Sequence, residues 1–131
     1  MLDAKKGKRV ILIAELDAQV IGQIFVNFHS TWRKSFHGQI SGYLHSFRVK
    51  PGFRNQSVGR TLIAKAEGIL KEHRYRGAVI SVARTNEAAL RLYQHLGYEV
   101  FREDPGQWSF IDHNNKVQHV SEPAFILYRN L

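Results

Sequence analysis

Apolar residues recur along this chain at two periods, which predict alternating strands and helices. Residues 10–15 and 20–28 are rich in β-branched and aromatic side chains, and the polar turn at residues 17–19 predicts that they form an antiparallel hairpin. A third such run spans residues 42–49. The Pro-Gly pair at residues 51–52 ends it, because proline has no N–H to donate to a strand ladder.

Residues 57–73 are predicted to form an amphipathic helix, because their apolar side chains fall at steps of three and four. Basic side chains occupy the opposite side of this helix. The predicted apolar face consists of Val58, Leu62, Ile63, Ala66, Ile69 and Leu70.

The second half of the chain repeats this alternation. Residues 78–83 predict a buried strand, and residues 86–96 a short helix, in which Asn86 is a favourable N-cap and Gly97 suits a left-handed C-terminal cap. From Tyr98 onward the pattern predicts short antiparallel strands that end with residues 124–128.

Composition fits one domain spanning residues 1–131, with a basic tail at residues 1–9. A chain of 131 residues with 44% hydrophobic content can bury one core, and we find no linker, repeat or composition break. The sequence contains neither an apolar run of about 20 residues nor a signal-peptide pattern. We therefore expect a cytoplasmic protein.

Cysteine is absent from the sequence, which excludes disulfides, thiolate metal sites and acyl-cysteine intermediates. Any acyl transfer would have to be direct. The seven histidines form no His-Glu-x-x-His pattern, and His113 and His119 flank a polar turn typical of a hairpin surface. We expect no metal site.

The net charge of +8 points to polyanionic partners, which include phosphorylated small molecules and nucleic acid. Charge alone does not choose between them. The sequence lacks the interleaved aromatic platform of single-strand binders, so nucleic acid is the weaker candidate.

Residues 54–59 lie between the third apolar run and the amphipathic helix. The unpaired N–H groups of a helix N-terminus attract anions through hydrogen bonds and the helix dipole, so this turn is a candidate phosphate site. It contains neither the Walker A pattern nor Gly-x-Gly-x-x-Gly. An ordinary strand-to-helix connection is the alternative.

The turn resembles the pyrophosphate loop of the GNAT superfamily of N-acetyltransferases, whose pattern is Arg/Gln-x-x-Gly-x-Gly/Ala. Arg54 and Gly59 match this pattern, and Ser57 stands where the first glycine is expected. A second segment, residues 86–98, resembles the family pattern Asn-x-x-Ala-x-x-x-Tyr-x-x-x-Gly-Phe/Tyr. Its matching residues are Asn86, Ala89, Tyr93, Gly97 and Tyr98.

The resemblance covers the chain from Val10 to its end and implies an α/β (α+β) fold. A mixed, mostly antiparallel central sheet would be flanked by helices, with a splayed strand pair that holds CoA. The family's usual opening strand and helices have no counterpart before Val10. We expect either an open acceptor side or a wall supplied by a partner chain, for example in a homodimer.

The resemblance also implies transfer of an acetyl group from acetyl-CoA to a primary amine of a small molecule or peptide, directly within a ternary complex. Tyr93 would protonate the departing thiolate; alternatively its ring only packs in the core. Phe47 and Val49 occupy the places whose backbone N–H groups serve the thioester and pantetheine. The implied cofactor-binding residues are Phe47, Val49, Arg54, Asn55, Gln56, Ser57, Val58, Gly59, Arg60, Asn86 and Ala89.

His45 lies where many relatives place a glutamate base, and an imidazole is suited to abstract a proton near neutral pH. A hydrogen-bonded wall residue is the alternative. Tyr43, Ser46 and Glu15 are weaker candidates for the base, and ordered waters could replace one. The aromatic residues that could shape an acceptor pocket, or instead serve core or dimer contacts, are Trp32, Phe36, His37, Tyr43, Trp108 and Phe110.

Two other functions remain open at this point. A catalytically silent CoA-binding or protein-interaction module would use the same fold without turnover. A basic nucleic-acid-binding protein would be consistent with the charge but with none of the motifs.

Overall fold

The computed structural model of the chain describes residues 9–28, 40–54 and 57–131. Asn55 and Gln56, together with Trp32, Phe36 and His37, lie outside the described residues.

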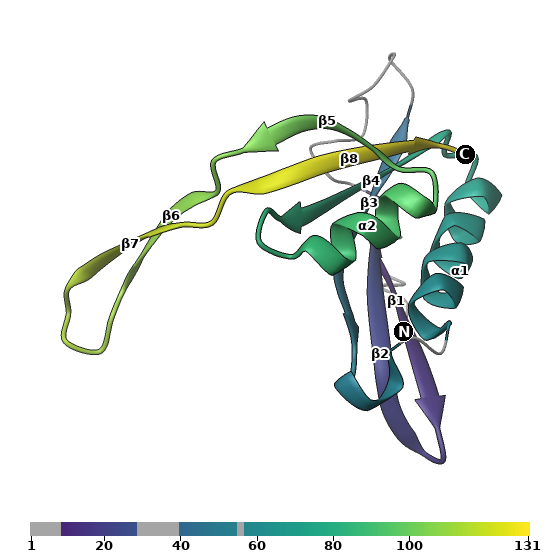
Figure 1. Ribbon diagram of the computed structural model, residues 1–131, viewed down its shortest axis with the longest axis horizontal. Coiled ribbons are helices and arrows are strands. Elements are labelled where there is room, and N and C mark those ends of the chain that lie inside the picture. Colours follow the sequence, from purple (N-terminus) through teal and green to yellow (C-terminus); the bar gives the residue numbers. More distant parts are fainter. Residues whose placement is uncertain (1–8, 29–39, 55–56) are drawn as a thin grey trace. The chain divides into compact units, whose positions relative to one another are not determined.

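The described residues form a mixed α/β fold with a mostly antiparallel sheet, which confirms the predicted fold class. Six strands form one sheet in the order β1-β2-β3-β4-β8-β5, and β6 pairs with β7 (Figure 1). The elements are β1 (Arg9–Leu16), β2 (Gln19–Asn27), β3 (Ser41–Val49), the 3-10 turn η1 (Pro51–Phe53), α1 (Val58–Glu72), β4 (Gly77–Ala83), α2 (Glu87–His95), β5 (Glu99–Asp104), β6 (Gln107–Ile111), β7 (Val117–Ser121) and β8 (Ala124–Asn130).

The chain divides into two compact units. Unit 1 comprises Met1–Ile80 and Tyr128–Leu131, and unit 2 comprises Ser81–Leu127. Unit 1 contains β1, β2, β3 and α1, whereas α2 and the β6–β7 hairpin belong to unit 2. Neither α1 nor α2 is long and apolar enough to cross a bilayer.

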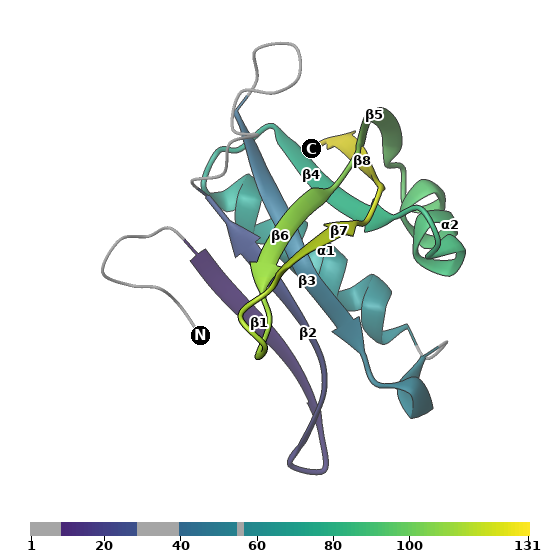
Figure 2. The same ribbon diagram turned by 90° about the vertical axis from the view of Figure 1, so that its left-hand side faces the viewer.

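The predicted hairpin at the start of unit 1 is confirmed. Antiparallel pairing joins β1 to β2, and the two residues between them, Asp17 and Ala18, have φ values of 51° and 63°. Two successive residues with positive φ make a type I′ turn, whose twist matches that of paired strands. In Figure 2, β1, β2 and β3 lie side by side with α1 behind them.

Helix α1 packs closely against β2 and β3 at two glycines of the sheet. A Cβ atom on Gly22 would lie 3.1 Å from Leu62 Cδ1, and one on Gly42 would overlap the side chain of Leu70. Leu70 is fully buried there. The helix therefore contributes its predicted apolar face to a core that it shares with β2 and β3.

Residues near the C-terminus also belong to unit 1. Arg129 Nη1 donates to Glu67 Oε1 of α1 at 2.7 Å, and Leu131 N donates to the carbonyl of Arg76 at 2.9 Å. The side chain of Glu67 is only 9% exposed. The contact with Arg129 offsets part of the cost of burying the charge of Glu67.

Unit 2 contains the second predicted helix, with both caps as expected. Asn86 Oδ1 accepts a hydrogen bond from Ala89 N at 3.2 Å, and Gly97 has a φ of 99°. The hairpin turn between β6 and β7 is stabilised by Asp112, whose side-chain oxygens accept from Asn114 N, Lys116 N and Gln118 Nε2. These bonds favour the ionised carboxylate and lower the pKa of Asp112.

The close approach of α1 to β3 makes Gly42→Ala a specific test of the packing. The added methyl group must displace the fully buried Leu70, so we expect a loss of about 1–3 kcal/mol in the free energy of unfolding. Urea denaturation followed by circular dichroism measures it.

Gly68→Ala in α1 is the matched control. A Cβ atom there meets nothing within 4 Å, and alanine is the better helix former, so we expect a gain of about 0.5–1 kcal/mol. Equal effects of the two substitutions would contradict the packing described here.

Candidate functional site

Strand β3 contains a β-bulge at the centre of the candidate site. Its register with β2 runs from Gln23↔Arg48 to Phe25↔His45, so two steps along β2 correspond to three along β3. Ser46 lies within this step and has a φ of 53°, an unusual value for a residue other than glycine. The register therefore places the bulge at Ser46.

Parallel pairing between β3 and β4 ends where the bulge begins. The registered pairs run from Ser41↔Gly77 to Leu44↔Ile80. The next residue of β3 is His45, followed by the bulged Ser46. An early end to pairing between these two strands is the expected mark of the splayed pair implied by the resemblance.

Because of the bulge, the side chains of His45 and Phe47, two residues apart on β3, lie on opposite faces of the sheet. His45 stacks on Tyr43 on the face away from α1, with ring centroids 5.2 Å apart. Phe47 faces α1, because a Cβ atom on Gly59 would lie 2.8 Å from Phe47 Cζ. Residues two apart on a regular strand share a face, so the extra residue separates His45 from Phe47.

Two side chains hold Ser46 in place. Gln23 Nε2, on the neighbouring strand, donates to the carbonyl oxygen of Ser46 at 3.1 Å. His45 Nδ1 lies 3.0 Å from Ser46 Oγ. These contacts stabilise a backbone conformation that residues other than glycine rarely adopt.

His45 is half-buried among aromatic and cationic groups. The ring of Phe25 lies 5.3 Å from it, and the guanidinium of Arg9 lies 5.5 Å from the Phe25 centroid. Burial, and secondarily the charge of Arg9, lower the pKa of His45 below 6.5. Both effects favour the neutral imidazole. Its Nε2 is buried without a hydrogen-bond partner among the described residues.

The turn before α1 ends in a left-handed residue. Ser57, the N-cap of α1, has φ 65° and ψ 9°, and its side chain makes no capping hydrogen bond. Its carbonyl accepts from Thr61 N at 3.0 Å. Glycine tolerates this conformation without strain, which explains why the family pattern has glycine at this position.

Two other predicted residues of the turn have structural roles. Arg54 Nε donates to the carbonyl of Val49 at 3.1 Å and so ties the turn to the end of β3. Gly59 lets the Phe47 ring reach the first turn of α1. Val58 packs towards Gly22, and Arg60 is exposed. The turn, Phe47, Val49 and His45 all belong to unit 1.

The remaining predicted residues belong to unit 2. Asn86 and Ala89 form the N-cap hydrogen bond of α2. Tyr93 is 4% exposed, and its ring centroid lies 6.3 Å from that of Tyr98. The ring of Tyr93 thus packs in the interior of unit 2, and its role as an acid stays a prediction.

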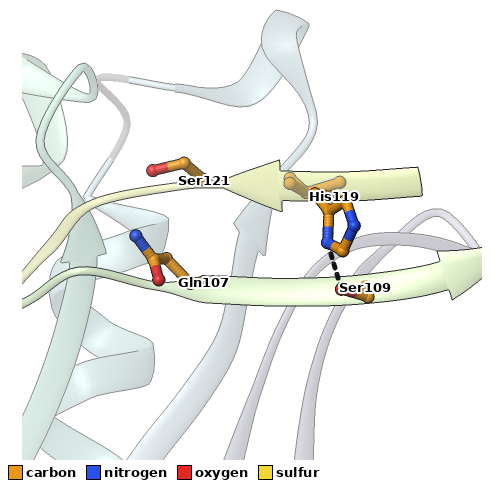
Figure 3. Close-up of a pocket in the computed structure, with 5 residues that line it drawn as sticks. Gln107, Ser109, His119 and Ser121 are labelled. Atoms are coloured by element: carbon orange, nitrogen blue, oxygen red, sulfur yellow. Dashed lines mark hydrogen bonds between the residues drawn. The ribbon is translucent and has the colours of Figure 1, made fainter. Parts of the chain in front are cut away.

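The β6–β7 hairpin contains a pocket lined by Gln107, Ser109, His119, Val120 and Ser121. Ser109 Oγ lies 2.9 Å from His119 Nδ1 across the two strands, as Figure 3 shows. Both side chains are exposed, as expected for a hairpin surface. Phe110 is 43% exposed on the same hairpin. Within the described ranges, no three His, Asp or Glu side chains are grouped so that they could hold a metal ion.

Sequence reasoning missed Gln23 and gave Ser46 only a minor role. No short motif marks a glutamine that supports a bulge on the neighbouring strand. The period-two pattern of residues 42–49 also does not reveal where an extra residue is inserted, because Ser46 and Phe47 are both compatible with a strand.

Strand β3 thus leaves its parallel partner just before the bulge, and the Ser57 side chain at the start of α1 makes no capping hydrogen bond. The sequence profile of the Acetyltransferase (GNAT) family matches residues 2–98. The chain therefore belongs to this family.

Similar proteins agree with this assignment. An uncharacterized N-acetyltransferase of Archaeoglobus fulgidus is 32% identical over 88 residues, which cover 67% of this chain and 58% of that protein. The mycothiol acetyltransferase of Acidimicrobium ferrooxidans is 30% identical over 71% of this chain and 29% of its own length. The chain thus spans between 29% and 58% of the curated relatives it matches.

Solved structures show the same fold. An acetyltransferase from Bacillus anthracis, in complex with acetyl coenzyme A, is 25% identical with a TM-score of 0.72, over 95% of this chain and 63% of that one. The IAA acetyltransferase from Bacillus cereus has a TM-score of 0.73 at 16% identity, over 95% of this chain and 79% of its own.

The left-handed Ser57 yields a stability prediction. Ser57→Gly removes the steric cost of this conformation, about 1–2 kcal/mol, at the expense of about 0.5–1 kcal/mol of unfolded-state entropy. We expect a net gain of up to about 1 kcal/mol in urea denaturation. Lys65→Gly, at an exposed site inside α1, should instead lose about 1 kcal/mol. If Ser57→Gly lowered the free energy of unfolding as much as Lys65→Gly does, the left-handed conformation assigned to Ser57 would be refuted.

Proposed function

We propose that this chain binds acetyl-CoA and transfers its acetyl group directly to a primary amine of a small molecule or peptide. The observation that carries the proposal is the end of β3–β4 pairing at Leu44, followed at once by the bulge at Ser46. The start of α1, where the Ser57 side chain makes no capping hydrogen bond, lies in the same unit. The pyrophosphate is assigned to residues 54–60 and the pantetheine arm to the backbone of Phe47 and Val49.

The charge distribution supports an anionic cofactor at this place. Residues 18–66 contain no Asp or Glu. Exposed basic side chains follow the bulge and continue into α1, so phosphates meet attraction without opposing carboxylates from this segment. These side chains are Arg48, Lys50, Arg54 and Arg60.

In the proposed mechanism, the amine nitrogen attacks the thioester carbon and forms the N–C bond. His45 Nε2 takes the proton that the amine must lose, and the C–S bond then breaks. Tyr93 O–H gives its proton to the departing thiolate. A proton passing through solvent from the imidazolium to the tyrosinate restores both groups. Asn86 and Ala89 are assigned to cofactor binding because they match the family pattern.

Binding and turnover are tested separately. Acetyl-CoA should raise the Tm of the protein, and an amine panel should release CoA thiol, which is readily detected because the protein has no cysteine. Stabilisation without turnover on any amine would favour the silent CoA-binding module. Steeply salt-dependent DNA binding without CoA binding would favour the nucleic-acid protein.

Gly59→Asp and Gly59→Ala form a matched pair that isolates charge at the phosphate site. Both place a Cβ atom against Phe47, but only aspartate adds a negative charge in the first turn of α1. We expect the aspartate variant to bind acetyl-CoA at least about tenfold more weakly than the alanine variant, as measured by calorimetry. An acidic residue in a first helical turn stabilises the helix by about 0.3–1 kcal/mol, so the weaker binding should not come from unfolding. Equal affinities would rule out this location for the phosphates.

Tyr93→Phe tests the proposed acid. The substitution keeps the buried ring and removes the hydroxyl, so we expect kcat to fall by about 100-fold or more while acetyl-CoA affinity changes little. Tyr98→Phe is the control, because this ring is equally buried and the family pattern accepts phenylalanine there. The acid role fails if both variants retain the same kcat.

A further inference from the structure

The hydroxyl of the bulge residue Ser46 contacts Nδ1 of His45, the ring nitrogen that takes no part in the proposed proton transfer. Ser46 Oγ lies 3.0 Å from His45 Nδ1, and the other ring nitrogen, Nε2, is buried without a partner among the described residues. Gln23 fixes the backbone of Ser46 at 3.1 Å. The ring plane of His45 is set by the stack with Tyr43, in which the planes differ by 18°.

We propose that Ser46 is a positioning residue, whose hydroxyl accepts a hydrogen bond from His45 Nδ1–H and so leaves Nε2 unprotonated and basic. The role of His45 Nε2 as a base rests on the proposed function, whereas the Nδ1–H tautomer of His45 does not depend on it. The bulge thereby selects which nitrogen of His45 can take a proton.

Two tautomers satisfy the contact, and burial distinguishes them. If Ser46 donated to Nδ1, the proton would sit on Nε2, and a buried N–H would have no acceptor among the described residues. With the proton on Nδ1, the unpartnered group is a lone pair. Orphaned buried N–H donors are rarer in proteins than orphaned acceptors, so the Nδ1–H tautomer is favoured.

The groups around His45 keep the ring neutral. Among the described residues, Arg9 of β1 and Tyr43 of β3 are the titratable or charged side chains that face it, and β2 contributes the apolar ring of Phe25. Burial and the charge of Arg9 both disfavour the imidazolium and lower the pKa of His45. A neutral ring with a fixed tautomer is the state that a base requires.

The chain contains a natural control for this contact. Ser109 Oγ and His119 Nδ1 lie 2.9 Å apart on the β6–β7 hairpin, so the same two atoms meet at a similar distance. There both residues are exposed, and water can serve either nitrogen of His119. The serine should therefore control the tautomer at His45 but not at His119.

Histidine-ring nitrogen NMR of the uniformly 15N-labelled full chain tests the proposal without any substrate. We expect His45 at pH 7.5 to carry its proton on Nδ1 and to titrate below 6.5. Ser46→Gly, which adopts a φ of 53° without strain, should shift His45 to a mixture of tautomers. Ser46→Asn, which also tolerates this φ and offers an amide oxygen, should restore the Nδ1–H form.

Ser109→Gly is the matched control and should leave the His45 signals unchanged. A wild-type His45 protonated on Nε2 would overturn the proposal, even if the Ser46 variants failed to fold. So would a tautomer ratio that is the same in the wild type and in Ser46→Gly.

Activity separates this inference from the proposed function. With an accepted amine, kcat/KM should fall as the pH drops through the pKa of His45, and Ser46→Gly should lower kcat/KM by about tenfold while acetyl-CoA affinity stays unchanged. An Nδ1–H tautomer without turnover on any amine would refute the proposed function and leave the inference standing. Turnover that Ser46→Gly leaves unchanged, with an unchanged tautomer, would refute the inference alone.

Discussion

The close approach of α1 to β2 and β3 is the constraint on which unit 1 depends. Gly22, Gly42 and Gly59 each lie where a side chain would meet the opposing element. The helix can therefore bury its apolar face directly on the sheet, and its first turn lies beside the end of β3. A larger residue at Gly22 or Gly59 would push the start of α1 away from the sheet, and a larger residue at Gly42 would push away its end at Leu70.

The β3 bulge lets two nearby side chains of the strand have different roles. Phe47 anchors the strand to the helix through Gly59, while His45, two residues earlier, contacts Phe25 on the opposite face. A regular strand would place both side chains on one face. One inserted residue thus separates a structural anchor from a candidate reactive group, at the cost of a strained Ser46.

Sequence predicted most of the architecture, because local chemistry determines it. The N-cap at Asn86 and the left-handed Gly97 defined α2, and the period of apolar residues defined α1 to within one residue at each end. The bulge at Ser46 and the left-handed Ser57 were not predictable from residue type, because serine is rare in that conformation. Their geometry depends on contacts distant in sequence, such as Gln23, that no local pattern contains.

The last residues of the chain complete the first unit, and this affects the order in which the protein can fold. Unit 2 is inserted between Ile80 and Tyr128, and Arg129, which donates a hydrogen bond to Glu67, is synthesised after the whole insertion. The ion pair between Arg129 and Glu67 can therefore form only after unit 2 has been synthesised. Unit 1 is therefore expected to reach its final stability only after residues 128–131 have been synthesised, whereas the contiguous segment Ser81–Leu127 can begin to fold earlier.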